Sequence, residues 1–168
     1  MNFKRQKANP KRVFLKSYID FQSIEIALKI IKEHKNKNLQ ISVIGKFKQT
    51  KLNDVKNLVS IENVIENRYK KLFESSKGYE ILSNPEIGTI FITGFLASLF
   101  SQEVELKKIG SMSTGPFGIL RGLGIDEEKV THSIKILNKG NYLLILRGDE
   151  NELTTIEDHI SITEKVQL

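Results

Sequence analysis

The chain contains no cysteine, which removes several kinds of chemistry at once. Disulfides, thiolate nucleophiles and cysteine-bound zinc are all excluded. Long apolar runs are also missing, because the most apolar stretch, residues 85–101, contains Thr and Ser and is too short to cross a bilayer. The basic N-terminus is not followed by the apolar segment of a secretory signal. These absences predict a cytoplasmic protein with no membrane partner.

Nucleotide-binding motifs are absent as well. The only phosphate-binding candidate is the glycine-rich segment 110–124, but its glycines do not have the G-x-G-x-x-G spacing of a dinucleotide fingerprint. No Lys-Ser or Lys-Thr pair completes a P-loop there. Tight turns and close packing explain the glycines, so no cofactor is predicted. A small-ligand or enzyme site at this loop remains an alternative.

Catalytic groups are few. The chain has three imidazoles, those of His34, His132 and His159. They lie far apart in the sequence and lack the i, i+4 spacing of a helical metal pair, so we expect surface histidines and no metal site. His132 and Glu128 share a helix face and form an alternative acid–base pair. The hydroxyl candidates are Ser111, Ser113 and Thr114. No nucleophile-elbow pattern surrounds them, and we predict no catalytic residue.

The positive charge is concentrated at one end. The net charge of +6 equals the six basic side chains of residues 1–16, a segment without Asp or Glu. Such an end can contact nucleic acid. The candidate contacts are Lys4, Arg5, Lys7, Lys11 and Arg12. We favour the other interpretation, in which residues 1–11 are a solvated flexible tail.

The remaining residues, 12–168, have the size of one domain. Bulky β-favouring residues predict a first strand over residues 12–19, and alternation predicts a second over 39–47. Between them, apolar residues at helical spacing predict a helix that Ser23 caps. Strand, helix and strand in this order form a βαβ unit.

Residues 124–148 have the clearest local signals. Asp126 is placed to cap a helix, and Gly140 is placed to end it. The run from Tyr142 to Leu146 is continuously apolar, which predicts a buried strand over residues 141–147.

The middle of the chain is less regular. A charged amphipathic stripe predicts a helix over residues 52–73, within an insertion at about 48–84. A third strand is expected over 87–93, and a helix over 94–106. In the glycine-rich segment, Gly115 and Pro116 can begin a short helical turn.

Four segments carry a family resemblance. They are Leu-Gln-Ile-Ser-Val-Ile-Gly at 39–45, Pro-Glu-Ile-Gly-Thr-Ile-Phe-Ile-Thr-Gly at 85–94, Gly-Ile-Leu-Arg-Gly-Leu-Gly-Ile-Asp-Glu-Glu-Lys-Val at 118–130 and Leu-Asn-Lys-Gly-Asn-Tyr-Leu-Leu-Ile-Leu at 137–146. Their order resembles the bacterial heat-induced general-stress protein family, a domain without an established biochemical function. The charged segment 52–77 departs from that family, whose middle is richer in Gly and Ala. The resemblance implies stress association and brings no catalytic residues.

Together these patterns predict an α+β fold: a small, mainly antiparallel sheet of about four strands, ferredoxin-like in plan, with helices on one face. The predicted function is non-enzymatic, through self-association or binding to a protein partner. An exposed apolar face on residues 52–73 or 94–106 would supply the interface. Nucleic-acid binding by the basic N-terminal third is the first alternative.

Overall fold

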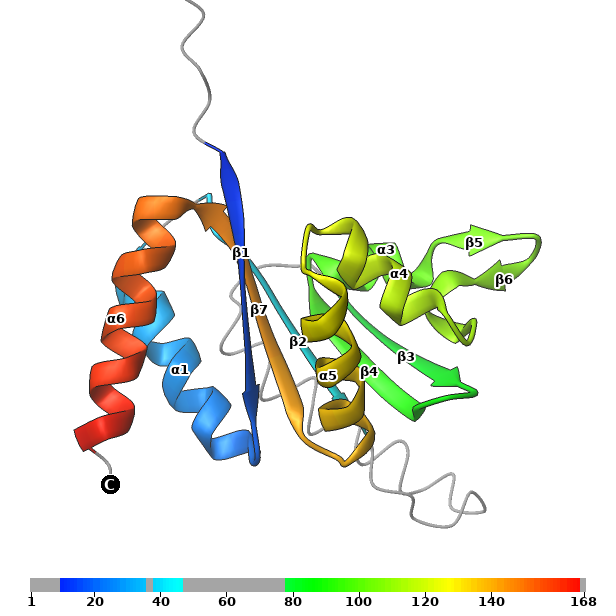
Figure 1. Cartoon of the computed structure of the whole chain (residues 1–168), viewed down its shortest axis with the longest axis horizontal. Coiled ribbons are helices and arrows are strands. Elements are labelled where there is room, and N and C mark those ends of the chain that lie inside the picture. Colours follow the sequence, from blue (N-terminus) through cyan, green and yellow to red (C-terminus); the bar gives the residue numbers. More distant parts are fainter. Residues whose placement is uncertain (1–9, 36–37, 47–77, 167–168) are drawn as a thin grey trace, which may run out of the picture.

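The computed structural model describes residues 10–35, 38–46 and 78–166. They form a five-stranded antiparallel sheet with helices packed against it (Figure 1). Its strands lie in the order β1 (Lys11–Tyr18), β7 (Tyr142–Asp149), β2 (Gln40–Lys46), β4 (Gly88–Gly94) and β3 (Tyr79–Asn84). Every neighbouring pair is antiparallel. Consequently β1 and β2 run parallel with β7 between them, and β4 and β7 run parallel with β2 between them. The prediction of an α+β fold with a mainly antiparallel sheet is confirmed.

The predicted count of about four strands is not confirmed, because the sheet has five. Each of the four predicted strands is present with its ends displaced by two residues at most, but β3 is a fifth strand. It lies inside the segment predicted to be a helical insertion, where it forms a hairpin with β4 that closes at the pair Asn84 and Gly88. The predicted helix 52–73 lies outside the described residues. Although two split βαβ units interleave in the sheet, its order and strand number do not confirm the ferredoxin-like plan.

Helices cover both faces of the sheet, so the prediction of helices on one face is wrong. One face packs against α1 (Phe21–Glu33) and α6 (Glu150–Val166); the other packs against α3 (Leu96–Ser101), α4 (Gly115–Gly122) and α5 (Glu127–Asn138) (Figure 1). The reason is in β7, where Leu143 to Leu146 are all buried and alternate between the two cores. A strand that is apolar on both faces needs a cover on each.

The ends of the helices follow local sequence signals. Asp126 accepts a hydrogen bond of 2.9 Å from the backbone N–H of Lys129, and Gly140 adopts φ +94° after α5, as predicted. The cap of α1 was assigned to the wrong residue. Asp20 is the cap, because its carboxylate accepts a 2.8 Å bond from the N–H of Ser23. That bond lowers the pKa of the Asp20 carboxyl.

The segment 94–124 differs from its prediction in two places. The helix expected over 94–106 ends at Ser101, and a small ribbon follows, formed by β5 (Glu103–Val104) and β6 (Lys107–Lys108). The glycine-rich segment is not a loop, because it forms a 3-10 turn, η1 (Ile109–Ser111), and then α4. The predicted helical start at Gly115 and Pro116 is confirmed.

Candidate interaction surface

The ribbon of β5 and β6 projects from one end of the molecule (Figure 1). Its two-residue turn consists of Glu105 and Leu106, whose φ angles are +51° and +65°. Two positive φ angles are typical of a type I′ turn, which normally uses Asn and Gly. For a glutamate and a leucine this backbone is strained, at a cost on the order of 1 kcal/mol for each residue.

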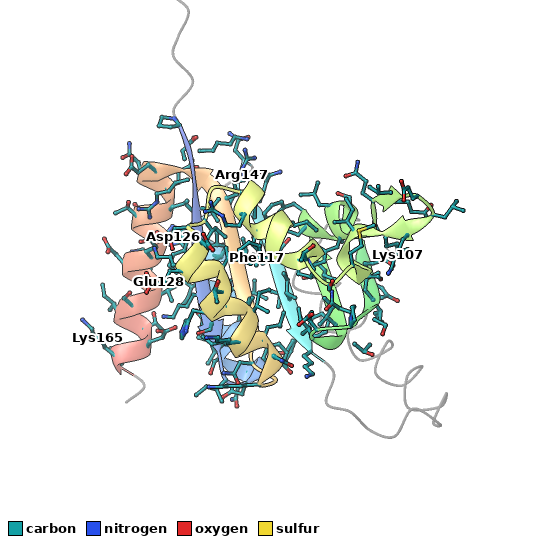
Figure 2. The ribbon with its side chains drawn as sticks, turned by 45° about the vertical axis from the view of Figure 1, so that its right-hand side comes forward. Lys107, Phe117, Asp126, Glu128, Arg147 and Lys165 are labelled. Carbon is teal, nitrogen blue, oxygen red and sulfur yellow. The ribbon has the colours of Figure 1, made fainter. Side chains whose placement is uncertain are left out.

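The strained turn presents an apolar side chain to solvent. Leu106 is 96% exposed, Val104 beside it is 49% exposed, and Leu99 on α3 is 39% exposed. We call the two ribbon residues, Val104 and Leu106, the ribbon surface. Figure 2 shows the ribbon, marked by Lys107, at the opposite end of the molecule from Lys165 on α6. The backbone strain of this turn costs stability, and a leucine exposed at its tip offsets none of that cost by burial, which directs attention to it as a contact site.

The base of the ribbon is held firmly. The N–H of Ile109 donates a 2.9 Å bond to the carbonyl oxygen of Gln102, which closes the ribbon where it leaves the domain. The ammonium of Lys108 pairs with the carboxylate of Glu80 on the edge strand β3. The tip is therefore exposed, while its base is anchored to the sheet.

A buried asparagine fixes the segment that follows the ribbon. The side-chain amide of Asn84 donates to the carbonyls of Gly110 at 2.9 Å and Met112 at 2.8 Å. Its oxygen accepts from the N–H groups of Glu86 at 2.9 Å and Ile87 at 3.1 Å. Asn84 is 2% exposed, so these four bonds satisfy a polar group that would otherwise be costly to bury. They join the β3–β4 turn to η1.

Two glycines allow η1 to pack closely against its neighbours. A Cβ at Gly110 would lie 2.3 Å from Cδ1 of Leu82, and a Cβ at Gly115 would lie 1.7 Å from the carbonyl oxygen of Ile109. Neither position has room for a side chain. This supports the packing interpretation of the glycine-rich segment, with η1 and α4 in place of a phosphate-binding loop.

A shallow cavity of about 340 Å³ lies beside the ribbon surface, between α3 and the edge of the sheet. The residues that line it include Tyr79, Glu80, Phe95, Ala97, Ser98 and Ser101. Among the described residues that line it, Glu80 is the only charged one, and Glu80 is paired with Lys108. This end of the molecule therefore carries both a partly apolar cavity and exposed apolar side chains.

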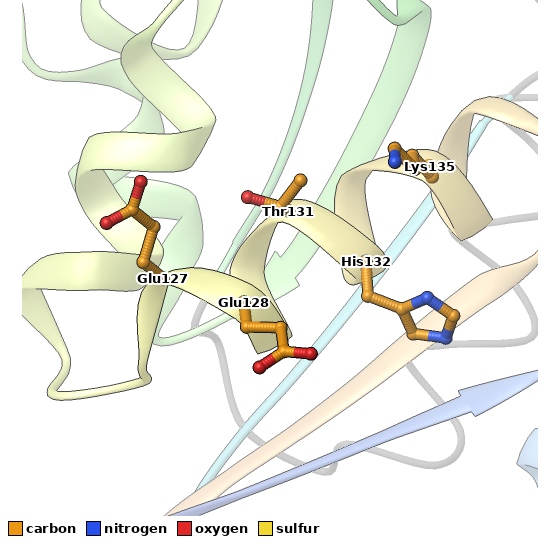
Figure 3. A pocket seen from close by; sticks show the side chains of 5 residues that line it. All are labelled: Glu127, Glu128, Thr131, His132 and Lys135. Carbon is orange, nitrogen blue, oxygen red and sulfur yellow. The ribbon is translucent and has the colours of Figure 1, made fainter.

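A second depression, of about 550 Å³, lies on the outer surface of α5 and contains the candidate pair Glu128 and His132 (Figure 3). Its five lining side chains spread outward from one helix in Figure 3 and do not converge on a point. Both members of the pair are exposed, and no hydrogen bond joins them to each other or to another described residue. The arrangement lacks the proximity and desolvation that tune an acid–base pair.

The hydroxyl candidates are not activated either. Ser111 is half-buried in η1, whereas Ser113 and Thr114 are exposed before α4. Among the residues that the structure describes, no imidazole or carboxylate accepts a hydrogen bond from these hydroxyls.

The candidate nucleic-acid contacts divide into two groups. Lys4, Arg5 and Lys7 lie outside the described residues. Lys11 is exposed at the start of β1, so the predicted tail does not reach residue 11. The guanidinium of Arg12 pairs with the carboxylate of Glu157 on α6.

Lys16 extends this ionic contact along β1, because its ammonium pairs with Glu164 on α6. Tyr18, at the end of the same strand, is 7% exposed, and its hydroxyl has no hydrogen-bond partner of good geometry among the described residues. Burial, with the nearby charge of Glu164, raises the pKa of the Tyr18 phenol above its usual range. Arg12 and Lys16 of β1 therefore add ionic contacts to the apolar packing of α6 against the sheet.

One contact is not predicted by any pattern in the sequence. His34 and His159, assigned to separate surface positions, meet at the outer side of α1 and α6. The Nδ1 atom of His159 lies 2.7 Å from the Nε2 atom of His34, and the ring centroids are 4.6 Å apart. A separation of 125 residues hides such a pair from any local pattern. Only the packing of α1 beside α6 reveals it.

Comparisons with known proteins do not assign this chain to a family. No protein-family model matches the sequence, no curated protein matches it, and no solved structure matches its fold. The resemblance to the general-stress family stays a prediction. Within the described ranges, no helix combines the length and hydrophobicity needed to span a membrane.

Proposed function

We propose that this protein is a non-enzymatic interaction domain that self-associates through the ribbon surface. The observation that carries the proposal is Leu106, a leucine 96% exposed in a left-handed turn that strongly disfavours it. Residue 106 belongs to the segment 94–106, one of the two for which the sequence predicted an apolar contact face. Stress association and a cytoplasmic location remain predictions that belong to this proposal.

The surroundings of Leu106 support a protein partner over a small ligand. The base of the ribbon is fixed by the Ile109–Gln102 hydrogen bond and the Lys108–Glu80 ion pair, so the tip is presented without much loss of entropy on binding. The cavity beside α3 lies on the same end of the molecule and offers a partly apolar recess. A second copy carries both features, an exposed leucine and a recess, so contacts between copies need no other chain.

The proposal is tested by the mass of the full chain in solution over a range of concentrations. Leu106→Asn removes the apolar tip and places a residue that tolerates positive φ in the turn, so the fold is preserved or stabilised. We expect the mass of the wild-type chain to rise with concentration and the variant to remain a monomer.

The matched control is Ile162→Asn, which alters another exposed apolar residue, 60% exposed on α6. This control should associate like the wild type, and so should a chain that lacks residues 1–9. A wild-type chain that is monomeric at every concentration would contradict the proposal. Equal effects of the two asparagine variants would contradict its location.

A further inference from the structure

We propose that His34 and His159 form a binding site for one divalent transition-metal ion of the kind that imidazole prefers, such as Zn²⁺, Ni²⁺ or Cu²⁺. The proposal starts from the 2.7 Å separation between Nδ1 of His159 and Nε2 of His34. At this distance the two nitrogens share one proton, so the lone pair of one ring points at the nitrogen of the other. A metal ion can replace that proton as the shared partner once both rings present unprotonated nitrogens.

The geometry needs only a small adjustment. In a tetrahedral zinc site with Zn–N bonds of 2.0–2.1 Å, two ligand nitrogens lie about 3.3 Å apart. The rings would therefore separate by about 0.6 Å, which small side-chain rotations supply. His159 is exposed and His34 is half-buried, so both rings can rotate and solvent can fill the remaining coordination positions.

The two backbones are already fixed in place. His34 is the C-terminal cap of α1, where its N–H donates to the carbonyl oxygen of Ile31. The N–H of Lys35 donates to the carbonyl oxygen of Lys32, and Lys35 turns the chain away with φ +47°. His159 precedes the buried Ile160 on α6. Since α1 and α6 share one core, the entropy of bringing the two ligands together is already lost on folding.

The number of protein ligands, two, determines the class of metal site. Within the described residues no group of three or more His, Asp or Glu side chains could hold a metal ion. The site is therefore an open chelate on the surface, unlike a closed structural zinc centre. Bound metal would join the end of α1 to α6, and it would bind the folded chain in preference to the unfolded one.

Isothermal titration of the full, metal-free chain with ZnCl₂ tests the proposal. We expect the wild-type chain to bind one ion. Each single variant, His34→Gln or His159→Gln, should bind Zn²⁺ about 100-fold more weakly, because either change leaves one ligand in place of a chelate. The matched control is His132→Gln, which removes the exposed histidine of α5 and should leave binding unchanged.

A second measurement identifies the ligands directly. In the electron paramagnetic resonance spectrum of the chain with one equivalent of CuSO₄, we expect hyperfine coupling to two imidazole nitrogens in the wild type and in His132→Gln. Each of the other two variants should retain one at most. Undiminished Zn²⁺ binding in the double variant His34→Gln/His159→Gln, or equal losses in all three single variants, would overturn the site.

Discussion

The two faces of the sheet are covered by different means. On one face, α1 and α6 pack through apolar stripes, the histidine contact joins the two helices, and ion pairs join α6 to β1. On the other face, the segment from α3 to α5 is held by positions where a side chain is missing, Gly110 and Gly115, and by the buried amide of Asn84. Both covers bury apolar side chains, and the second depends in addition on close approach of the backbone.

This difference predicts unequal tolerance to substitution. Long helices that meet a sheet through many apolar contacts lose a little stability for each change, since the contacts are numerous and individually small. A backbone that touches backbone cannot yield to an added atom without moving a segment. The second face should therefore be the sensitive one, although its residues are small and chemically plain.

The largest expected effect comes from placing a methyl group where the backbone leaves no space. Gly115→Ala would put a Cβ 1.7 Å from the carbonyl oxygen of Ile109, so we expect a loss of about 3 kcal/mol in the free energy of unfolding. Gly118→Ala, in the same helix, meets nothing within 4 Å and should gain up to about 1 kcal/mol from helix propensity. Urea denaturation of both variants measures the contrast; two changes of the same sign would break the comparison.

A smaller effect is expected on the first face, at the unpartnered hydroxyl of Tyr18. Tyr18→Phe removes a buried polar group without leaving a cavity, so the variant should be more stable by about 1 kcal/mol at neutral pH. The raised pKa of Tyr18 also gives a pH signature. The folded chain keeps this phenol neutral while the unfolded chain releases its proton above a pH of about 10. The stability of the wild-type chain therefore does not vary with this group below that pH and falls above it.

The alkaline signature separates Tyr18 from the other tyrosines, because those are present in both proteins. The stability advantage of Tyr18→Phe should widen as the pH rises above about 10, when measured by denaturation at a series of pH values. A constant difference between the two chains over that range would show that Tyr18 ionises equally easily in the folded and unfolded states.

The smallest effect is expected from the ion pairs between β1 and α6. Arg12→Met and Lys16→Met keep the aliphatic length and remove the charge, and we expect a loss of about 0.5 kcal/mol from each because both pairs are partly exposed to solvent. The loss should shrink at high salt. A loss above that of Gly115→Ala would reverse the proposed order of the two faces.

Local signals predicted the regular elements well. Asp126, Gly140 and the apolar run after it define α5 and β7 because capping, helix termination and burial act within a few residues. Strand β3, which was not predicted, has no such local signal. Its residues Tyr79–Asn84 are half polar and are strand only through pairing with β4. Which helices would cover which face was equally beyond a local reading.

The sequence indicated which segment contains the candidate site, but not the secondary structure of that segment. Residues 94–106 were expected to supply an apolar helix face, yet the chain after Ser101 turns back on itself as a ribbon. No Asn-Gly or Gly-containing signal marks the turn at Glu105 and Leu106, so the usual hairpin chemistry is absent. The contact of His34 with His159 likewise depends on tertiary packing alone.

The position of β1 has a consequence for the order of folding. Its sheet partner β7 begins more than 120 residues after β1 ends, and its ionic partners on α6 follow later still. During synthesis at roughly 5–20 residues per second, β1 would therefore wait for about 6 to 25 seconds before its neighbours emerge. Contacts of such long sequence separation also slow refolding of the complete chain. The first described strand is thus the last to be secured, with its apolar residues unprotected until the final helix closes over them.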